Sequence, residues 1–151
     1  MRKLASPPRL RPRPWAASLM LVGLVQLAPL AQAQVVVIVH PSVAALAPKS
    51  EQIANLFLGK VDSLPGSPVL TPIDQSEGKP TRSQFYKAVA NRDEAQIKAY
   101  WSRIMFTGRA QAPRALGSDA EVKRLVAATP GAIGYIDKAA LDGTVKVLAQ
   151  Y

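Results

Sequence analysis

A polar segment in the middle of the chain, residues 74–82 with the sequence DQSEGKPTR, holds residue types that bind anions. A helix is predicted to begin within it, and a helix N-terminus offers free N–H groups and about half a positive charge. Ser76 and Thr81 would add hydroxyl donors, and Lys79 and Arg82 would add positive charge. The segment is therefore the first candidate for binding phosphate or a related oxyanion.

The same segment has a plainer interpretation. Hydroxyl residues are common caps at helix starts, so Thr81 or Ser76 could serve only to cap the helix while the cations are solvated. Two carboxylates, Asp74 and Glu77, also stand in the segment and would repel an anion. Both interpretations stay open at the level of the sequence.

A second basic segment lies before the last predicted helix. Arg109 and Arg114 precede the helix start at Ser118, and two guanidinium groups near a helix N-terminus can hold a carboxylate or a phosphate. The alternative is a solvated surface loop. His40 follows a buried strand, where ligands bind in open α/β sheets, although a structural hydrogen bond is its commoner role. The candidate ligand-binding residues are Ser76, Thr81, Arg82 and Arg109.

No arrangement of residues in the sequence indicates catalysis. The chain has no cysteine, which excludes disulfides, thiolate metal sites and cysteine nucleophiles. Its single histidine cannot supply the two or three imidazoles of a histidine-based metal site. The sequence also lacks the nucleophile-elbow, zinc-protease and phosphate-loop motifs. We therefore expect a protein that is not an enzyme, with no catalytic residues, no metal and no cofactor.

The first 33 residues have the three parts of a secretory signal peptide. Five basic residues with no acidic neighbour are followed by an apolar stretch from 15 to 30 and then by Ala31-Gln32-Ala33. The apolar stretch is shorter than the roughly 20 residues of a membrane-spanning helix. We predict cleavage after Ala33 and a periplasmic protein. The alternative is an uncleaved membrane anchor.

The rest of the chain, residues 34–151, is expected to form one domain. Without the five positive charges of the leader it keeps 14 basic and 10 acidic residues, a net charge of +4. That excess is weak support for nucleic-acid binding, and export argues against it as well. We therefore expect no nucleic-acid partner.

Hydrophobic periodicity and turn residues predict strands and helices along this domain. Five β-branched residues in a row predict a first strand buried on both faces, as in a parallel sheet. Residues 109–117 are predicted to be a surface loop. The order of elements predicts an α/β fold, with a central mixed sheet flanked by helices. The predicted strands are 35–39, 69–73, 132–136 and 144–148, and the predicted helices start at Ser50, Pro80, Asp93 and Ser118.

Three segments resemble motifs of the phosphate-type periplasmic substrate-binding proteins of ABC transporters. Residues 53–60, IANLFLGK, resemble the IFLGK helix end of that family, and residues 129–135 resemble its TPGAIGY turn and strand. Thr81-Arg82 with Phe85 takes the place of the family's SGTR-x-x-F anion loop. The two longer motifs are specific, and the match to the anion loop is partial.

The resemblance implies the type 2 periplasmic-binding-protein fold, in which two α/β lobes close on a ligand through a hinge. It spans about residues 35–148, the size of one lobe, so the chain resembles a single-lobe short form. Lys79-Pro80 stands where the family has Ser-Gly, which removes a hydroxyl and a backbone N–H. The resemblance therefore implies weak binding of phosphate or a related oxyanion, linked to ABC-type phosphate uptake with a permease as partner.

Two other hypotheses follow from the single lobe. A lobe built to face another surface exposes that face, so the chain is alternatively a periplasmic protein-interaction module that docks an envelope protein and has no transport role. A homodimer, in which a second copy replaces the other lobe, is the third hypothesis.

Overall fold

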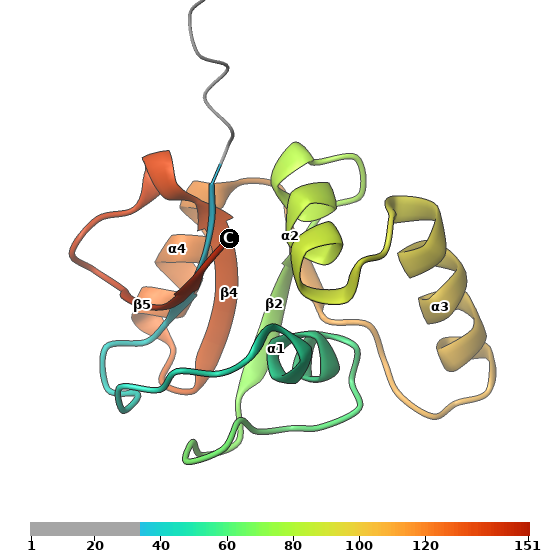
Figure 1. The fold of residues 1–151 in the computed structure, drawn as a ribbon, viewed down its shortest axis with the longest axis horizontal. Coiled ribbons are helices and arrows are strands. Elements are labelled where there is room, and N and C mark those ends of the chain that lie inside the picture. The colour runs from blue at the N-terminus through green and yellow to red at the C-terminus, as the bar shows by residue number, and fades with distance from the viewer. Residues whose placement is uncertain (1–33) are drawn as a thin grey trace, which may run out of the picture. The chain divides into compact units, whose positions relative to one another are not determined.

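The computed structural model describes residues 34–151, so the predicted signal peptide lies outside the described residues and its cleavage stays a prediction. Residues 34–151 form a five-stranded mixed sheet in the order β3-β2-β4-β1-β5, with helices on both faces (Figure 1). The predicted α/β fold is confirmed. The strands are β1 (Val35–Val39), β2 (Thr71–Gln75), β3 (Arg114–Leu116), β4 (Ala132–Asp137) and β5 (Lys146–Gln150). The helices are α1 (Ser50–Phe57), α2 (Pro80–Ala90), α3 (Glu94–Phe106), α4 (Asp119–Ala128) and the short 3-10 helix η1 (Lys138–Ala140).

The sheet has a parallel part and an antiparallel part. β2 is parallel to both β3 and β4, so the carboxyl ends of these three strands meet at one edge. β1 is antiparallel to both of its neighbours, β4 and β5. The prediction that β1 is buried on both faces is confirmed, but the parallel pairing that it suggested is wrong. Helices cover both faces of this sheet, and that coverage selects an unbroken apolar run whatever the strand direction.

Alternating side chains along β1 supply both halves of the hydrophobic core. Val35, Val37 and Val39 pack with residues of α1, α2 and α3 on one face of the sheet. Val36 and Ile38 pack with residues of α4 on the other face. Figure 1 shows this division, with α4 behind the sheet and α1 and α2 in front. Burying each of these side chains contributes roughly 1.5–3 kcal/mol.

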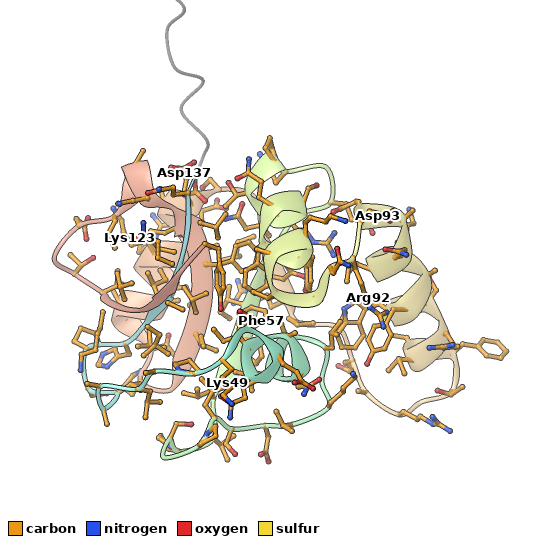
Figure 2. The ribbon with its side chains drawn as sticks, viewed as in Figure 1. Lys49, Phe57, Arg92, Asp93, Lys123 and Asp137 are labelled. Carbon is orange, nitrogen blue, oxygen red and sulfur yellow. The ribbon has the colours of Figure 1, made fainter. Side chains whose placement is uncertain are left out.

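An aromatic cluster fixes α1 and α2 to the sheet. Phe85 of α2 stacks on Tyr135 of β4, with 3.9 Å between ring centroids. Phe57 of α1 meets Phe85 edge to face at 4.8 Å, and its side chain points toward the sheet in Figure 2. Tyr86 of α2 contacts Phe85 at 5.1 Å. The cluster therefore holds two tyrosine hydroxyls in the interior, next to the end of β2.

Close packing of α4 on β4 depends on a glycine. A Cβ atom on Gly134 would lie 2.6 Å from Cγ1 of Val122, which is closer than carbon atoms approach. The start of α4 follows the predicted cap, since the Ser118 hydroxyl accepts from the N–H of Glu121 at 3.3 Å. The Glu121 carboxylate accepts from the N–H of Gly117 at 2.8 Å. The last predicted helix thus begins where the sequence predicts it.

Three segments differ from the prediction. A short strand, β3, lies inside residues 109–117, which were predicted to be a loop; it has three residues and no apolar run to mark it. β2 and β5 each begin two residues later than predicted. Asp74 and Gln75 belong to β2 because their polar side chains find partners in the interior. Ser50, predicted to cap α1, is instead its first helical residue.

Candidate anion-binding site

Asp74, near the end of β2, carries a buried carboxylate surrounded by donors. Its side chain accepts hydrogen bonds from the hydroxyl of Tyr86 at 2.8 Å and from the hydroxyl of Tyr135. Arg82 Nε lies 3.4 Å from both carboxylate oxygens. The N–H of Gln75 donates to the same carboxylate at 2.7 Å. Asp74 is 3% exposed and Arg82 is 5% exposed, so this ion pair lies in the interior.

The two tyrosines remain protonated donors over a wide pH range. Burial raises the pKa of Tyr86 well above its ordinary value, and the negative charge of Asp74 raises it further. Burial and the negative charge of Asp74 also raise the pKa of Tyr135. Burial lowers the pKa of Arg82, but the opposing effect of Asp74 and the other nearby acids is larger, so its pKa is raised. The cluster is therefore a fixed set of donors around one carboxylate.

Glu94, the first residue of α3, places a second carboxylate at the N-terminus of α2. Its Oε1 atom accepts from the backbone N–H of Gly78 at 3.2 Å and from the guanidinium of Arg82. Its Oε2 atom lies 3.5 Å from the hydroxyl of Ser83. The N–H comes from the loop before α2, and the guanidinium and the hydroxyl come from the first turn of α2, where the helix dipole also favours an anion. The anion that these donors hold in this protein is the carboxylate of Glu94.

Local sequence explains how Glu94 reaches this position. Asn91 ends α2 in the left-handed conformation with φ of 50°, and the chain turns at once into the next helix. Asp93 caps α3 by accepting from the N–H of Gln96 at 2.8 Å, as predicted. Arg92 and Asp93, labelled in Figure 2, mark this connection between α2 and α3. α2 begins at Pro80, and its N-cap residue Lys79 makes no side-chain cap. Glu94 instead accepts from the N–H of Gly78, in the loop just before that cap.

The structure brings three of the four predicted ligand-binding residues to the same end of α2. The hydroxyl of Ser76 donates to the carbonyl of Leu116 at 3.2 Å, and its N–H donates to the same oxygen at 2.9 Å. Thr81 is half-buried in the first turn of α2. Arg82 is in place, but its guanidinium is engaged by two carboxylates. The cation expected to attract a ligand is therefore shared between two acids of the protein.

Arg109 does not join this cluster. α3 begins at Glu94 beside the N-terminus of α2 and runs for 13 residues, about 20 Å, away from it. Arg109 follows the far end of that helix on an exposed loop. The second predicted anion site is not assembled either. The N-terminus of α4 already holds Ser118 and Glu121 as acceptors, and Asp119 beside them accepts from the amide of Gln75 at 2.6 Å.

Sequence reasoning missed Glu94 and the two tyrosines. Glu94 follows Arg82 by twelve residues across a helix end, a separation with no local signature. Tyr86 and Tyr135 stand in apolar stretches and belong to the core. Nothing in the sequence indicates that their hydroxyls bind Asp74. The other sequence candidate, His40, makes the structural hydrogen bond that was its alternative, since Nδ1 lies 2.7 Å from the hydroxyl of Ser42.

Metal-ligating clusters and membrane-spanning helices are both absent from residues 34–151. Within this range no three potential metal-ligating side chains lie close enough together to hold an ion. In the same range no helix combines the length and the apolarity that crossing a bilayer requires.

Comparisons with known proteins identify the fold of this chain. No model of a known protein family matches the chain, and no curated protein matches it either. Solved structures do match. An ABC-type phosphate transport receptor from Vibrio cholerae aligns with 77% of this chain and 46% of its own, at 16% identity and a TM-score of 0.59. The chain has the fold of phosphate-type substrate-binding proteins.

Two more structures agree on this fold. PstS from Borrelia burgdorferi shares 20% identity at a TM-score of 0.59. A phosphate ABC transporter substrate-binding protein from Clostridium perfringens, solved with bound phosphate, shares 23% identity at a TM-score of 0.56. They match 77–78% of this chain but only 45–47% of their own length. The chain therefore spans less than half of these phosphate-type proteins and corresponds to a single lobe.

Proposed function

We propose that residues 34–151 are an exported, solute-binding-protein-like module that binds phosphate or a related oxyanion weakly. The observation that carries the proposal is the N-terminus of α2, where Gly78, Arg82 and Ser83 direct three donors at one carboxylate of the protein itself. These donors form an anion site with a resident anion. An incoming oxyanion must displace Glu94 or share its donors.

This competition supports weak rather than tight binding. Each charge-assisted hydrogen bond contributes about 1.5–3 kcal/mol, and a millimolar dissociation constant corresponds to about −4.1 kcal/mol, so two or three new bonds are needed. Pro80 offers no N–H to an anion, and Arg82 remains paired with Asp74 even if Glu94 moves away. The groups left to hold the ligand are Lys79, which is exposed, and Thr81, which is half-buried in the first turn of α2.

The proposed location and partner of the module rest on the predicted leader and on the matched proteins. The matched structures are described as phosphate transport receptors or ABC transporter substrate-binding proteins. By analogy with them we assign the module to the periplasm and to ABC-type phosphate uptake, with a permease as its membrane partner. Of the predicted ligand-binding positions Ser76, Thr81, Arg82 and Arg109, we retain Thr81 for direct contact with the ligand, because Arg82 stays paired with Asp74.

Titration calorimetry with phosphate, sulfate and arsenate tests this proposal. Binding in the millimolar range is expected for the unaltered protein, and Thr81→Ala should weaken it several-fold. Thr107→Ala is the matched control, because Thr107 lies beyond the far end of α3 and its hydroxyl donates to the carbonyl of Ile104. The absence of heat and of any thermal shift at 10 mM ligand, about ten times a millimolar dissociation constant, would reject oxyanion binding.

A second candidate function is the protein-interaction module. The observation in its favour is Phe106 at the end of α3, whose side chain is 94% exposed beside Met105 at 50%. Exposed aromatic residues are enriched in the centres of protein interfaces.

Sedimentation of the protein alone tests the homodimer. A dimer that Phe106→Ser dissociates would establish self-association, whereas a monomer would leave only a different envelope protein as the partner.

A further inference from the structure

A groove lies at the edge of the sheet opposite the candidate anion site. Its volume is about 1080 Å³, and its walls include the first residues of β2 and β3, Thr71 and Arg114. The N-terminus of α2 follows the other, carboxyl end of β2, so the two features share no residue. In Figure 1 the connection from α1 to β2 runs below α1, and the connection from α3 to β3 passes between α1 and α3; both contribute to the groove. Nothing in the oxyanion proposal uses this surface.

The size and lining of the groove suit a peptide better than a small solute. Pockets for small molecules measure about 300–1,000 Å³, so this groove lies at the upper end of that range and has room for an extended peptide segment. Trp101 and Leu56 give it an apolar floor, and the amide side chains of Asn55 and Gln111 can pair with a peptide backbone. The benzene ring of Trp101 lies against Gly59, where a Cβ atom would be 3.1 Å from it, so the rim is low at that point.

One wall of the groove has backbone groups free to pair. β3 is at the end of the sheet and pairs only with β2, which leaves its outer side open. Gln111 and Ala112, just before it, make no backbone hydrogen bond within the described residues. An open strand edge is a template for another extended chain, and peptides bind proteins in this way. The free edge and the apolar floor together define a place for one added strand.

Charge selects the kind of peptide. Lys60 and Arg114 line the groove, are exposed, and have no ion-pair partner among residues 34–151. Asp62 is the single acidic residue in the lining, so the groove carries a net positive charge. The groove charge disfavours the leader of this chain as the occupant, because residues 1–33 contain basic residues and no acidic one. We propose that this groove binds an extended segment of a protein partner in which acidic residues alternate with apolar ones.

Panning a phage library of random twelve-residue peptides against the protein tests this inference. The enriched peptides are expected to alternate acidic and apolar residues. A synthetic copy of the most enriched peptide should bind the protein in a fluorescence polarisation assay. The double variant Lys60→Glu/Arg114→Glu should weaken that binding about tenfold, because two surface charge pairs are replaced by repulsion. Ala112→Trp, which fills the groove from its exposed wall, should weaken it as well.

Matched controls separate the groove from general charge effects. Lys87→Glu/Arg124→Glu makes the same change of charge at exposed positions outside the groove, and it should leave the affinity unchanged. Melting temperatures of all variants establish that they fold. No enriched peptide, or peptides that bind the Lys60→Glu/Arg114→Glu variant as tightly as the original protein, would overturn the inference. A homodimer that Ala112→Trp dissociates would overturn it in favour of a second copy as the occupant.

Discussion

The Glu94 carboxylate and the Arg82 guanidinium form an ion pair at the N-terminus of α2. The same guanidinium lies 3.4 Å from the carboxylate of Asp74, so one cation serves two acids. The Arg82 side chain is 7% exposed and that of Glu94 is 30% exposed, which puts the pair at the boundary between interior and solvent. An external oxyanion at this helix end therefore meets donors that are already engaged and two fixed negative charges.

Removing the shared cation should destabilise the domain strongly. Arg82→Met leaves the carboxylate of Asp74 buried with its counter-ion gone, and breaking a buried pair in this way costs about 3–5 kcal/mol. Urea unfolding followed by circular dichroism measures the loss. Lys98→Met is the matched control, because Lys98 pairs with Glu77 at 3.2 Å between side chains that are 66% and 57% exposed. An exposed pair of this kind contributes at most about 1 kcal/mol, and equal losses for the two variants would contradict the account.

The buried tyrosines predict a loss of stability in alkali. Burial raises the pKa of Tyr86 and of Tyr135, so above about pH 10 the unfolded chain loses these protons while the folded protein keeps them. The unfolded state then binds fewer protons, and the free energy of unfolding falls as the pH rises. Each tyrosine contributes a slope of about 1.4 kcal/mol per pH unit, and this contribution to stability is complete below about pH 10.

Tyr86→Phe tests this slope directly. The variant should be less stable at neutral pH, because Asp74 loses a hydrogen bond. Its free energy of unfolding should nevertheless fall less steeply above about pH 10, by about 1.4 kcal/mol per pH unit relative to the original protein. Urea unfolding at a series of alkaline pH values gives both slopes. Identical slopes would mean that Tyr86 ionises in the folded state as easily as in the unfolded chain.

Gly134→Ala should disturb the packing of α4 on the sheet. The added methyl group would lie 2.6 Å from Val122 Cγ1 and 3.2 Å from Val126 Cγ2, and both side chains are buried. Overpacking of this kind costs about 1–3 kcal/mol. Gly143→Ala is the control, since nothing lies within 4 Å of its Cβ position. Thermal unfolding of the two variants compares them, and a Gly134→Ala variant as stable as Gly143→Ala would show that α4 shifts freely.

The sequence predicted the parts of the fold that depend on local patterns. The run from Val35 to Val39 and the caps at Asp93 and Ser118 appear where they were expected. β3 was missed, because its three residues, two of them exposed, have no hydrophobic pattern of their own and are defined by their pairing with β2. The suggestion that β1 pairs in parallel with its neighbours was wrong. Burial on both faces shows only that helices cover the strand, and it carries no information about the direction of the neighbouring strands.

The helix start beside the candidate site was predicted correctly, but the carboxylate of Glu94 that lies there was not predicted. Pro80 and the hydroxyl residues around it located the helix start where an anion would be stabilised. The carboxylate that occupies it comes from Glu94, and only the turn at Asn91 and the capping of α3 by Asp93 bring that residue back to α2. The retention of Arg82 by Asp74 is likewise a tertiary contact between β2 and α2.

A phosphate titration of the Glu94→Ala variant tests the central claim, that Glu94 occupies an anion site, most directly. Glu77→Ala removes a carboxylate from the neighbouring loop without touching the donors of α2 and serves as the control. Calorimetry should show that Glu94→Ala binds phosphate at least about tenfold more tightly than the unaltered protein, a gain of about 1.4 kcal/mol, with no gain for Glu77→Ala. A folded Glu94→Ala variant that binds phosphate no better than the unaltered protein would contradict the account.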